Sequence, residues 1–175
     1  MYIDAGSVLS TAQAVTVTAP STNGYDTAGL GIGQAVTNRP VGGTTTNFGQ
    51  DVGGGGPAAS APQLVVTVPT AFTAGGSATL QVQLQCAVDV NNTGLPVTWD
   101  TIDQTDAFAV ALLTASSPQR PLASFTVPDR YPGQGFPRFY RLNYVVATGP
   151  MTAGALTAAL LTGIDDVPFY PAAYT

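Results

Sequence analysis

The residues best suited to chemistry in this chain are aspartates. Asp100, Asp103 and Asp106 occupy every third position of the segment DTIDQTD, and Asp165 and Asp166 are adjacent. Carboxylate oxygens are preferred calcium ligands, and two carboxylates flanking a glycosidic bond can hydrolyse it. Aspartate also favours turns, where it shapes and solubilises loops. Three interpretations therefore stay open: a calcium site, a hydrolytic pair, or loop residues between strands, and the last is the simplest.

Composition excludes most other catalytic chemistry. All ten acidic residues are aspartate, all five basic residues are arginine, and histidine, lysine and glutamate are absent. Without histidine no Ser-His-Asp or Cys-His arrangement can form, and a single cysteine, Cys86, with no histidine argues against a zinc site. A phosphate-binding loop needs a lysine. We therefore predict that the protein is not an enzyme and binds no cofactor.

The charge balance restricts the partners. The formal net charge is −5 and the sequence pI is about 4.1, which argues against nucleic acid because nucleic-acid binding needs a basic surface. No apolar run reaches the length that spans a membrane. The start MYIDAGSVLS lacks the basic and apolar regions of a secretory signal. We expect synthesis in a cytoplasm and no membrane partner.

Alternating hydrophobicity predicts the elements that must position these residues. In the segment GGSATLQVQLQCAVDV, every second residue is apolar and the residues between are mostly glutamine. This is the period of a strand with one buried and one wet face. The predicted inward set is Leu80, Val82, Leu84, Cys86 and Val88, and the outward set includes Gln81, Gln83 and Gln85. An uncharged amide face can be covered by a partner at a lower desolvation cost than a charged one.

Similar runs predict further strands at 12–19, 63–72, 107–115, 121–128 and 138–147. The run at 107–115 is expected to be buried, with a helical turn as the alternative. In 138–147, Tyr140, Leu142, Tyr144 and Val146 are expected to point inward. Short strands about ten residues apart, separated by glycine and proline, are typical of a sandwich, jelly roll or barrel. The sequence predicts one all-β antiparallel domain over residues 1–175.

Two segments do not fit a compact strand pattern. Residues 41–62 are rich in glycine, threonine and alanine and include four consecutive glycines, so we predict a long loop or arm. Residues 165–175 form an extended tail with Phe169, Tyr170 and Tyr174 among prolines. Three aromatic side chains on a loose end would be an exposed apolar surface. We expect them to contact this domain or a neighbouring subunit.

Arginines and aromatic residues cluster before and inside the strand at 138–147. Arg130, Tyr131, Phe136 and Arg138 are residue types that are enriched where partners dock. We assign them, with the tail aromatics, to a predicted partner interface. The alternative is stacking within the chain, which is favoured for Arg141 because it follows the strand alternation.

Four stretches carry a family resemblance. An N-terminal AQAVT segment, LVVTVPTAFTAGGSATLQVQLQ, AFAVALLTA and RFYRLNYVVATGPMTAGALTAAL occur in this order. Together they resemble the capsid cement, or decoration, proteins of tailed bacteriophages, of the type found in a Bordetella phage. The resemblance covers most of the chain but not the insert around 44–61 or the residues after Ile164.

The resemblance implies a jelly-roll domain on the outer surface of an icosahedral capsid. Such a protein would bridge neighbouring major capsid proteins as a homodimer or homotrimer and stabilise the shell, and no catalytic residues carry over. The longer insert and the aromatic tail depart from the family pattern. Two alternatives stay open: another minor virion or head-fibre protein, and a carbohydrate-binding β-sandwich that uses Trp99, tyrosines and calcium held by aspartates.

Overall fold

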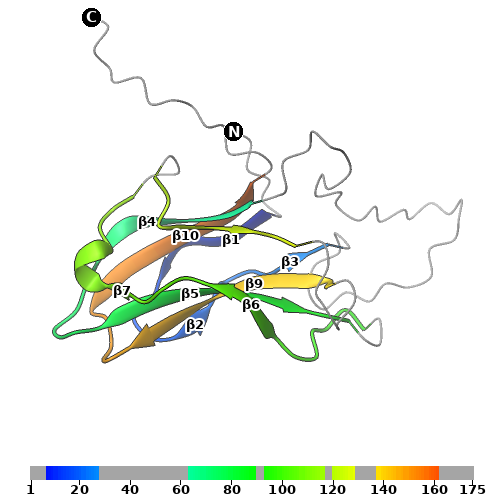
Figure 1. Cartoon of the computed structure of the whole chain (residues 1–175), viewed down its shortest axis with the longest axis horizontal. Coiled ribbons are helices and arrows are strands. Elements are labelled where there is room, and N and C mark those ends of the chain that lie inside the picture. The colour runs from blue at the N-terminus through cyan, green and yellow to red at the C-terminus, as the bar shows by residue number, and fades with distance from the viewer. Residues whose placement is uncertain (1–6, 28–62, 90–92, 117–119, 129–136, 162–175) are drawn as a thin grey trace, which may run out of the picture.

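The computed structural model describes residues 7–27, 63–89, 93–116, 120–128 and 137–161 (Figure 1). They form two antiparallel β-sheets and one short 3-10 helix. The elements, in chain order, are β1 (Val8–Ala14), β2 (Ala19–Pro20), β3 (Tyr25–Asp26), β4 (Gln63–Thr73), β5 (Thr79–Ala87), β6 (Asp100–Gln104), β7 (Phe108–Ala109), η2 (Val110–Leu112), β8 (Ala123–Thr126), β9 (Phe139–Ala147) and β10 (Ala153–Leu161). None of the helical turns in the described ranges is long and apolar enough to cross a bilayer.

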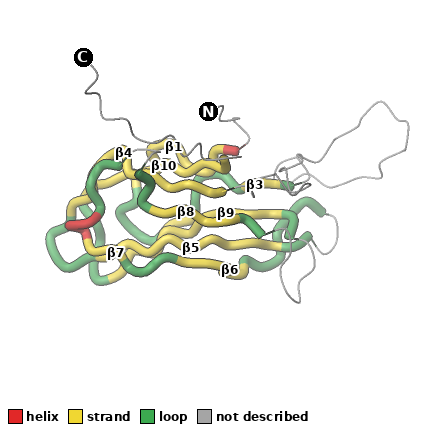
Figure 2. The backbone as a smooth tube through the Cα atoms, turned by 45° about the horizontal axis from the view of Figure 1, so that its top comes forward, coloured by secondary structure: helices red, strands yellow, loops and turns green. Residues whose placement is uncertain are grey.

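The two sheets face each other as a sandwich (Figure 2). One sheet has the strand order β1-β10-β4-β8. The other has the order β2-β9-β5-β6, with β3 paired to β9 and β7 paired to β5. The chain crosses repeatedly between the sheets, and its first strand pairs with its last. This is the connectivity of a jelly roll, in which two Greek keys form a double sheet, so the predicted fold class is confirmed.

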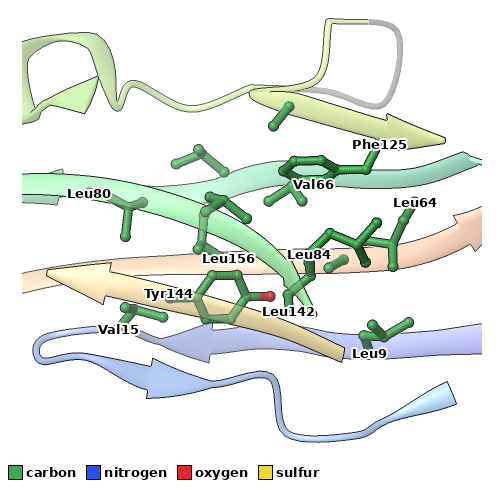
Figure 3. Packing of buried hydrophobic residues seen from close by; sticks show 14 of the residues in the cluster. Leu9, Val15, Leu64, Val66, Leu80, Leu84, Phe125, Leu142, Tyr144 and Leu156 are labelled. Atoms are coloured by element: carbon green, nitrogen blue, oxygen red, sulfur yellow. The ribbon is translucent and has the colours of Figure 1, made fainter. Parts of the chain in front are cut away.

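Side chains from both sheets meet in one continuous core (Figure 3). On β5, Leu80, Val82, Leu84 and Cys86 are buried, as their spacing predicts, while Val88 lies beyond the strand and is half-buried. On β9, Tyr140, Leu142 and Tyr144 are buried and Val146 packs partly against them. The four-stranded sheet contributes a matching set that includes Leu9, Leu64, Val66, Phe125 and Leu156. Along β5 and β9, the alternation in the sequence therefore sets which face of the strand forms the core.

One polar contact crosses this core. The Tyr144 hydroxyl lies 2.8 Å from Ser10 Oγ, which joins β9 in one sheet to β1 in the other. Ser10 Oγ donates its proton to Gln13 Oε1 at 2.8 Å, so the Tyr144 hydroxyl donates to Ser10. Burial raises the pKa of Tyr144 to about 12, against a smaller lowering effect of the Ser10 hydrogen bond. The phenol is therefore a neutral donor in a buried hydrogen bond that joins the two sheets.

A glycine is required where β10 begins. Gly154 has a φ of +135°, and a Cβ atom there would lie 2.2 Å from Cδ1 of Phe72. The Phe72 ring is buried and belongs to the neighbouring strand β4. Only glycine allows both this backbone conformation and this close approach.

The predicted strand at 12–19 is wrong in its position. Strand β1 covers Val8–Ala14, and bends at residues 16–18 separate it from β2. Ala12 has a φ of +43°, and the pairing with β10 shifts register around it. This irregularity breaks the alternation, so Val15 is buried while Val17 is exposed.

The predicted buried strand at 107–115 is also wrong. Only β7 is extended, η2 follows it, and most of the segment is exposed. Leu113 is buried in the core, Phe108 and Val110 pack partly against it, and the Leu113 carbonyl accepts a 3.0 Å hydrogen bond from Phe72 N. The helical turn that the sequence left open is the form observed, because one anchoring leucine covers the end of the sandwich without a further strand.

Candidate partner-binding surface

The described residues that flank the segments assigned to a partner lie at one end of the sandwich. In the four-stranded sheet, Gln63 pairs with both Leu161 and Thr126. In the six-stranded sheet, Phe139 pairs with both Asp26 and Ala87. We call the end of the sandwich marked by these residues the loop end.

Hydrogen bonds between the sheets show that this is a single end. The Tyr140 hydroxyl donates to Pro128 O at 2.6 Å, which joins the start of β9 to the residues after β8. Asn23 N donates to Leu9 O at 2.8 Å, which joins the turn before β3 to β1. The opposite end carries the β1–β2 connection, η2 and the β9–β10 connection, which we call the η2 end.

Most of the predicted interface lies outside the described residues. This applies to the predicted loop 41–62, the predicted tail 165–175, and the side chains Arg130, Tyr131, Phe136, Phe169, Tyr170 and Tyr174. Their described neighbours in the sequence, Gln63, Pro128, Pro137 and Leu161, belong to the loop end. These assignments stay predictions.

Arg138 is the described member of that predicted interface, and the structure shows its contacts within its own chain. The residue is only 8% exposed. Its Nε and Nη2 donate to the two carboxylate oxygens of Asp26 at 2.9 and 3.0 Å, and its Nη1 donates to Asp89 Oδ2. The guanidinium also lies 4.7 Å from the centre of the Phe139 ring. Arg138 therefore joins parts of its own chain, because two buried carboxylates attract it inward.

This buried group, which we call the Arg138 triad, ties together three connections at the loop end. Asp26 ends β3, Asp89 begins the connection from β5 to β6, and Arg138 precedes β9. Backbone bonds reinforce the arrangement: Arg138 N donates to Ala87 O at 3.0 Å, and Thr27 N donates to Arg138 O at 2.9 Å. The hydrogen bond to Asp26 is the largest effect that raises the pKa of Arg138 above its ordinary value. The guanidinium stays charged.

Asp89 also holds the turn that follows it. Its carboxylate accepts hydrogen bonds from Thr93 N and Gly94 N, both at 2.9 Å. Desolvation raises the pKa of the Asp89 carboxyl, but the bonds from Gly94, Arg138 and Thr93 outweigh it, and the pKa lies below its ordinary value. Gly94 has a φ of +80°, which suits a glycine in a tight turn. The sequence offered one signal for this arrangement, the turn-forming segment NNTGLP.

The three aspartates of DTIDQTD do not form a metal site. Asp100 and Asp103 lie on strand β6 and not in a loop, and Asp106 lies just after it. The Asp103 carboxylate accepts a 2.8 Å hydrogen bond from Gln104 N. Within the described ranges, no three acidic, cysteine or histidine side chains gather closely enough to hold a metal ion. Asp100, through its charge, adds to the effect of burial in raising the pKa of the Cys86 thiol.

The glutamine side chains of β5 point outward, as predicted, and take part in an amide network. Gln83 Nε2 donates to Gln104 Oε1 at 3.2 Å, and Asn143 Nδ2 donates to Gln83 Oε1 at 3.0 Å. Gln81 Nε2 donates to Thr105 O at 2.9 Å. These contacts link β9, β5, β6 and the residue that follows β6, and the alternation along β5 did not reveal them. Because the amides largely satisfy one another, this outer face is polar; Gln81 and Gln83 are half-buried, Gln85 is buried, and Arg141 on β9 lies opposite Gln85.

An arginine–tryptophan stack lies beside this face. The Arg141 guanidinium carbon lies 4.2 Å from the centre of the Trp99 ring, and Arg141 Nε donates to Gln85 Oε1 at 2.8 Å. Burial lowers the pKa of Arg141 below its ordinary value. The intramolecular stacking favoured for Arg141 is therefore observed, with tryptophan as its partner. One face of Trp99 is thereby occupied, and that face is not a free platform for a sugar.

Two exposed aliphatic residues in the same region were missed in the sequence. Leu95 and Val97 lie between the Asp89-bound turn and Trp99, and both side chains are exposed. The segment GLPVTW contains them, but its glycine and proline predicted only a turn.

Comparison with known proteins identifies the family. The family model described as Bbp16 matches residues 30–160, which is well over half of the chain. The chain belongs to the Bbp16 family. The match extends from before β4 to all but the last residue of β10, so that the Bbp16 region contains most of both sheets while β1 to β3 precede it. No curated protein matches the chain.

Proposed function

We propose that this Bbp16-family protein is a structural cement protein of a tailed bacteriophage. In this role it binds the outside of an assembled icosahedral capsid, bridges neighbouring major capsid proteins and stabilises the shell. The observation that carries the proposal is a jelly-roll domain in a chain of this family. Double-sheet jelly rolls are a recurrent architecture of virion proteins. The chain is made in the host cytoplasm and acts on the virion surface.

The energetics of such a role suit this domain. A protein that binds the closed shell but not free subunits adds its binding free energy to the stability of the shell. Many copies on one lattice, each contacting more than one subunit, gain further by multivalency. Amide side chains that hydrogen-bond to one another lose less free energy on desolvation than charged ones when a partner covers them, and β5, β6 and β9 carry such a network beside Arg141.

Co-sedimentation of the purified protein with empty, uncemented capsids tests this function. We expect saturable binding in a fixed ratio to the major capsid protein, and rupture of the decorated shells at a higher temperature. Free major capsid protein serves as the control and should bind far more weakly. Absence of binding to closed shells would overturn the proposal and direct attention to glycans.

Self-association is part of the same proposal. We expect a homodimer or homotrimer, which analytical ultracentrifugation of the free protein would detect. Deleting Phe169 to Thr175 is expected to weaken shell binding or self-association while the β domain stays folded. Unfolding of that deletion variant would place the tail in the core.

A further inference from the structure

The connection between β5 and β6 displays an apolar pair at the loop end. Leu95 is 55% exposed and Val97 is 61% exposed, and only Pro96 separates them in the sequence. Single exposed aliphatic residues are ordinary on a protein surface. Two on one short connection present apolar surface that a partner could cover with a gain in free energy.

Both borders of this pair are fastened to the body of the domain. On the N-terminal side of the pair, the Asp89 carboxylate accepts hydrogen bonds from Thr93 N and Gly94 N and forms an ion pair with Arg138. After it, Trp99 is stacked against Arg141. A partner that covers Leu95 and Val97 therefore has little loop freedom to remove, which lowers the entropic cost of association.

The strand that follows carries negative charge along the edge of the sheet formed by the described strands. β6 is the outermost strand of its sheet, as Figure 2 shows, and Asp103 and Asp106 are exposed while Asp100 is half-buried. A shallow hollow of about 430 Å³ opens along this strand and is lined by Thr101, Ile102, Asp103 and Gln104. A partner protein that approaches β6 therefore meets edge backbone groups, a hollow that can take a side chain, and the carboxylates of Asp103 and Asp106.

These features select one kind of occupant. A second copy of this chain carries the same excess of negative charge, −5 in total, and would be repelled by Asp103 and Asp106. A neutral polysaccharide would gain little from Leu95 and Val97, because exposed aliphatic side chains favour apolar contacts. A protein surface with an apolar centre and basic side chains at its rim matches both the aliphatic pair and the carboxylates.

We propose that Leu95, Val97 and strand β6 form the docking surface for the assembled shell, and that the shell presents an apolar patch bordered by basic side chains there. This inference rests on the proposed cement function and adds to it the face that is used. The Arg138 triad and the Trp99–Arg141 stack act as positioning groups, since they hold the docking residues in place.

The test compares two double variants in the shell co-sedimentation assay. Leu95→Ser with Val97→Ser removes the apolar pair, and we expect at least about tenfold weaker binding, as for residues at the centre of an interface. The matched control is Val17→Ser with Leu112→Ser, which removes side chains 59% and 66% exposed at the η2 end. The control should bind within about twofold of the unaltered protein. Each variant should melt at the same temperature as the unaltered protein, which shows that its fold is intact.

A charge variant tests the second part of the surface. Asp103→Asn with Asp106→Asn should weaken shell binding about threefold to tenfold at low salt and flatten its salt dependence. Unchanged affinity and salt dependence would refute the basic rim.

The outcomes separate the two proposals. If the unaltered protein does not bind shells, both the cement function and the docking surface are refuted. If it binds and the Leu95/Val97 variant binds equally well, only the docking surface is wrong. If that variant loses self-association but retains shell binding, the occupant is a second copy, and the inference is again overturned.

Discussion

Replacing Arg138 by methionine should destabilise the domain strongly at neutral pH. The substitution keeps the apolar stem but leaves the carboxylates of Asp26 and Asp89 without the cation that contacts both. Removing one partner of a buried ion pair costs about 3–5 kcal/mol. The total stability of a domain is about 5–15 kcal/mol, so the loss is a large share of it. For a chain of this size it corresponds to a fall in melting temperature of roughly 6–20 °C.

Urea unfolding followed by circular dichroism at pH 7 measures this loss by linear extrapolation. Arg141→Met is the matched control, because it removes a nearby arginine, three residues along the chain in β9, without leaving a buried carboxylate. That control loses the hydrogen bond to Gln85 and the stack on Trp99, which together contribute about 1–2 kcal/mol. A loss below about 1 kcal/mol for Arg138→Met would refute the assignment of the triad as a stabilising unit.

The pH dependence gives a second check on the charge argument. In the unaltered protein the folded-state pKa of Asp89 is lowered, so its contribution to stability is present above the ordinary value of about 3.9. This contribution is lost as the pH falls through the lowered pKa. Without Arg138 the Asp89 carboxyl loses one of the bonds that lower its pKa. The variant should therefore lose less stability on acidification, and the difference in stability between the two proteins should stay nearly constant from pH 7 to about pH 5 and narrow as the pH falls below about 4. A difference that stays constant below about pH 4 would contradict the reasoning.

Four further outcomes follow from the core and the aspartates. Tyr144→Phe removes the proton that Ser10 accepts and should cost about 1–2 kcal/mol in urea unfolding. Gly154→Ala forces a Cβ against the Phe72 ring and should cost about 2–4 kcal/mol, and a cycle with Phe72→Ala should show strong coupling. Burial raises the pKa of the Cys86 thiol, so a thiol reagent should react at least about a hundredfold faster in urea than in the native protein. Millimolar calcium should leave the melting temperature unchanged within about 1 °C, because the described aspartates form no ligand cluster.

The strand faces could be predicted because burial repeats with the period of the strand. Leu80, Val82 and Leu84 follow that period along β5, and Tyr140 and Leu142 follow it along β9. Where the backbone departs from regular geometry, the period misleads. Ala12 has a positive φ inside β1, so the alternation of the neighbouring valines was assigned to a strand that does not exist there.

The candidate surface was harder to predict because its contacts join distant parts of the chain. Arg138 lies 112 residues from Asp26 and 49 residues from Asp89 in the sequence. An arginine beside aromatic residues in the sequence predicts a docking site. The pattern is the same whether the guanidinium faces solvent or pairs with a buried carboxylate of its own chain. Composition alone therefore could not show that Arg138 is buried. The stack of Arg141 on Trp99 depends in the same way on a fold that places β9 next to the β5–β6 connection.

The pairing of the first strand with the last determines when this domain can form. β10 lies between β1 and β4, with Ala159 opposite both Val8 and Val65. The four-stranded sheet therefore cannot close until β10 has left the ribosome. Folds dominated by such distant pairings mature in milliseconds to seconds and not in microseconds. A chain stalled before β10 would expose β1 and β4 as unpaired edges that favour aggregation, so β10 must be synthesised before the domain can meet a partner in its folded form.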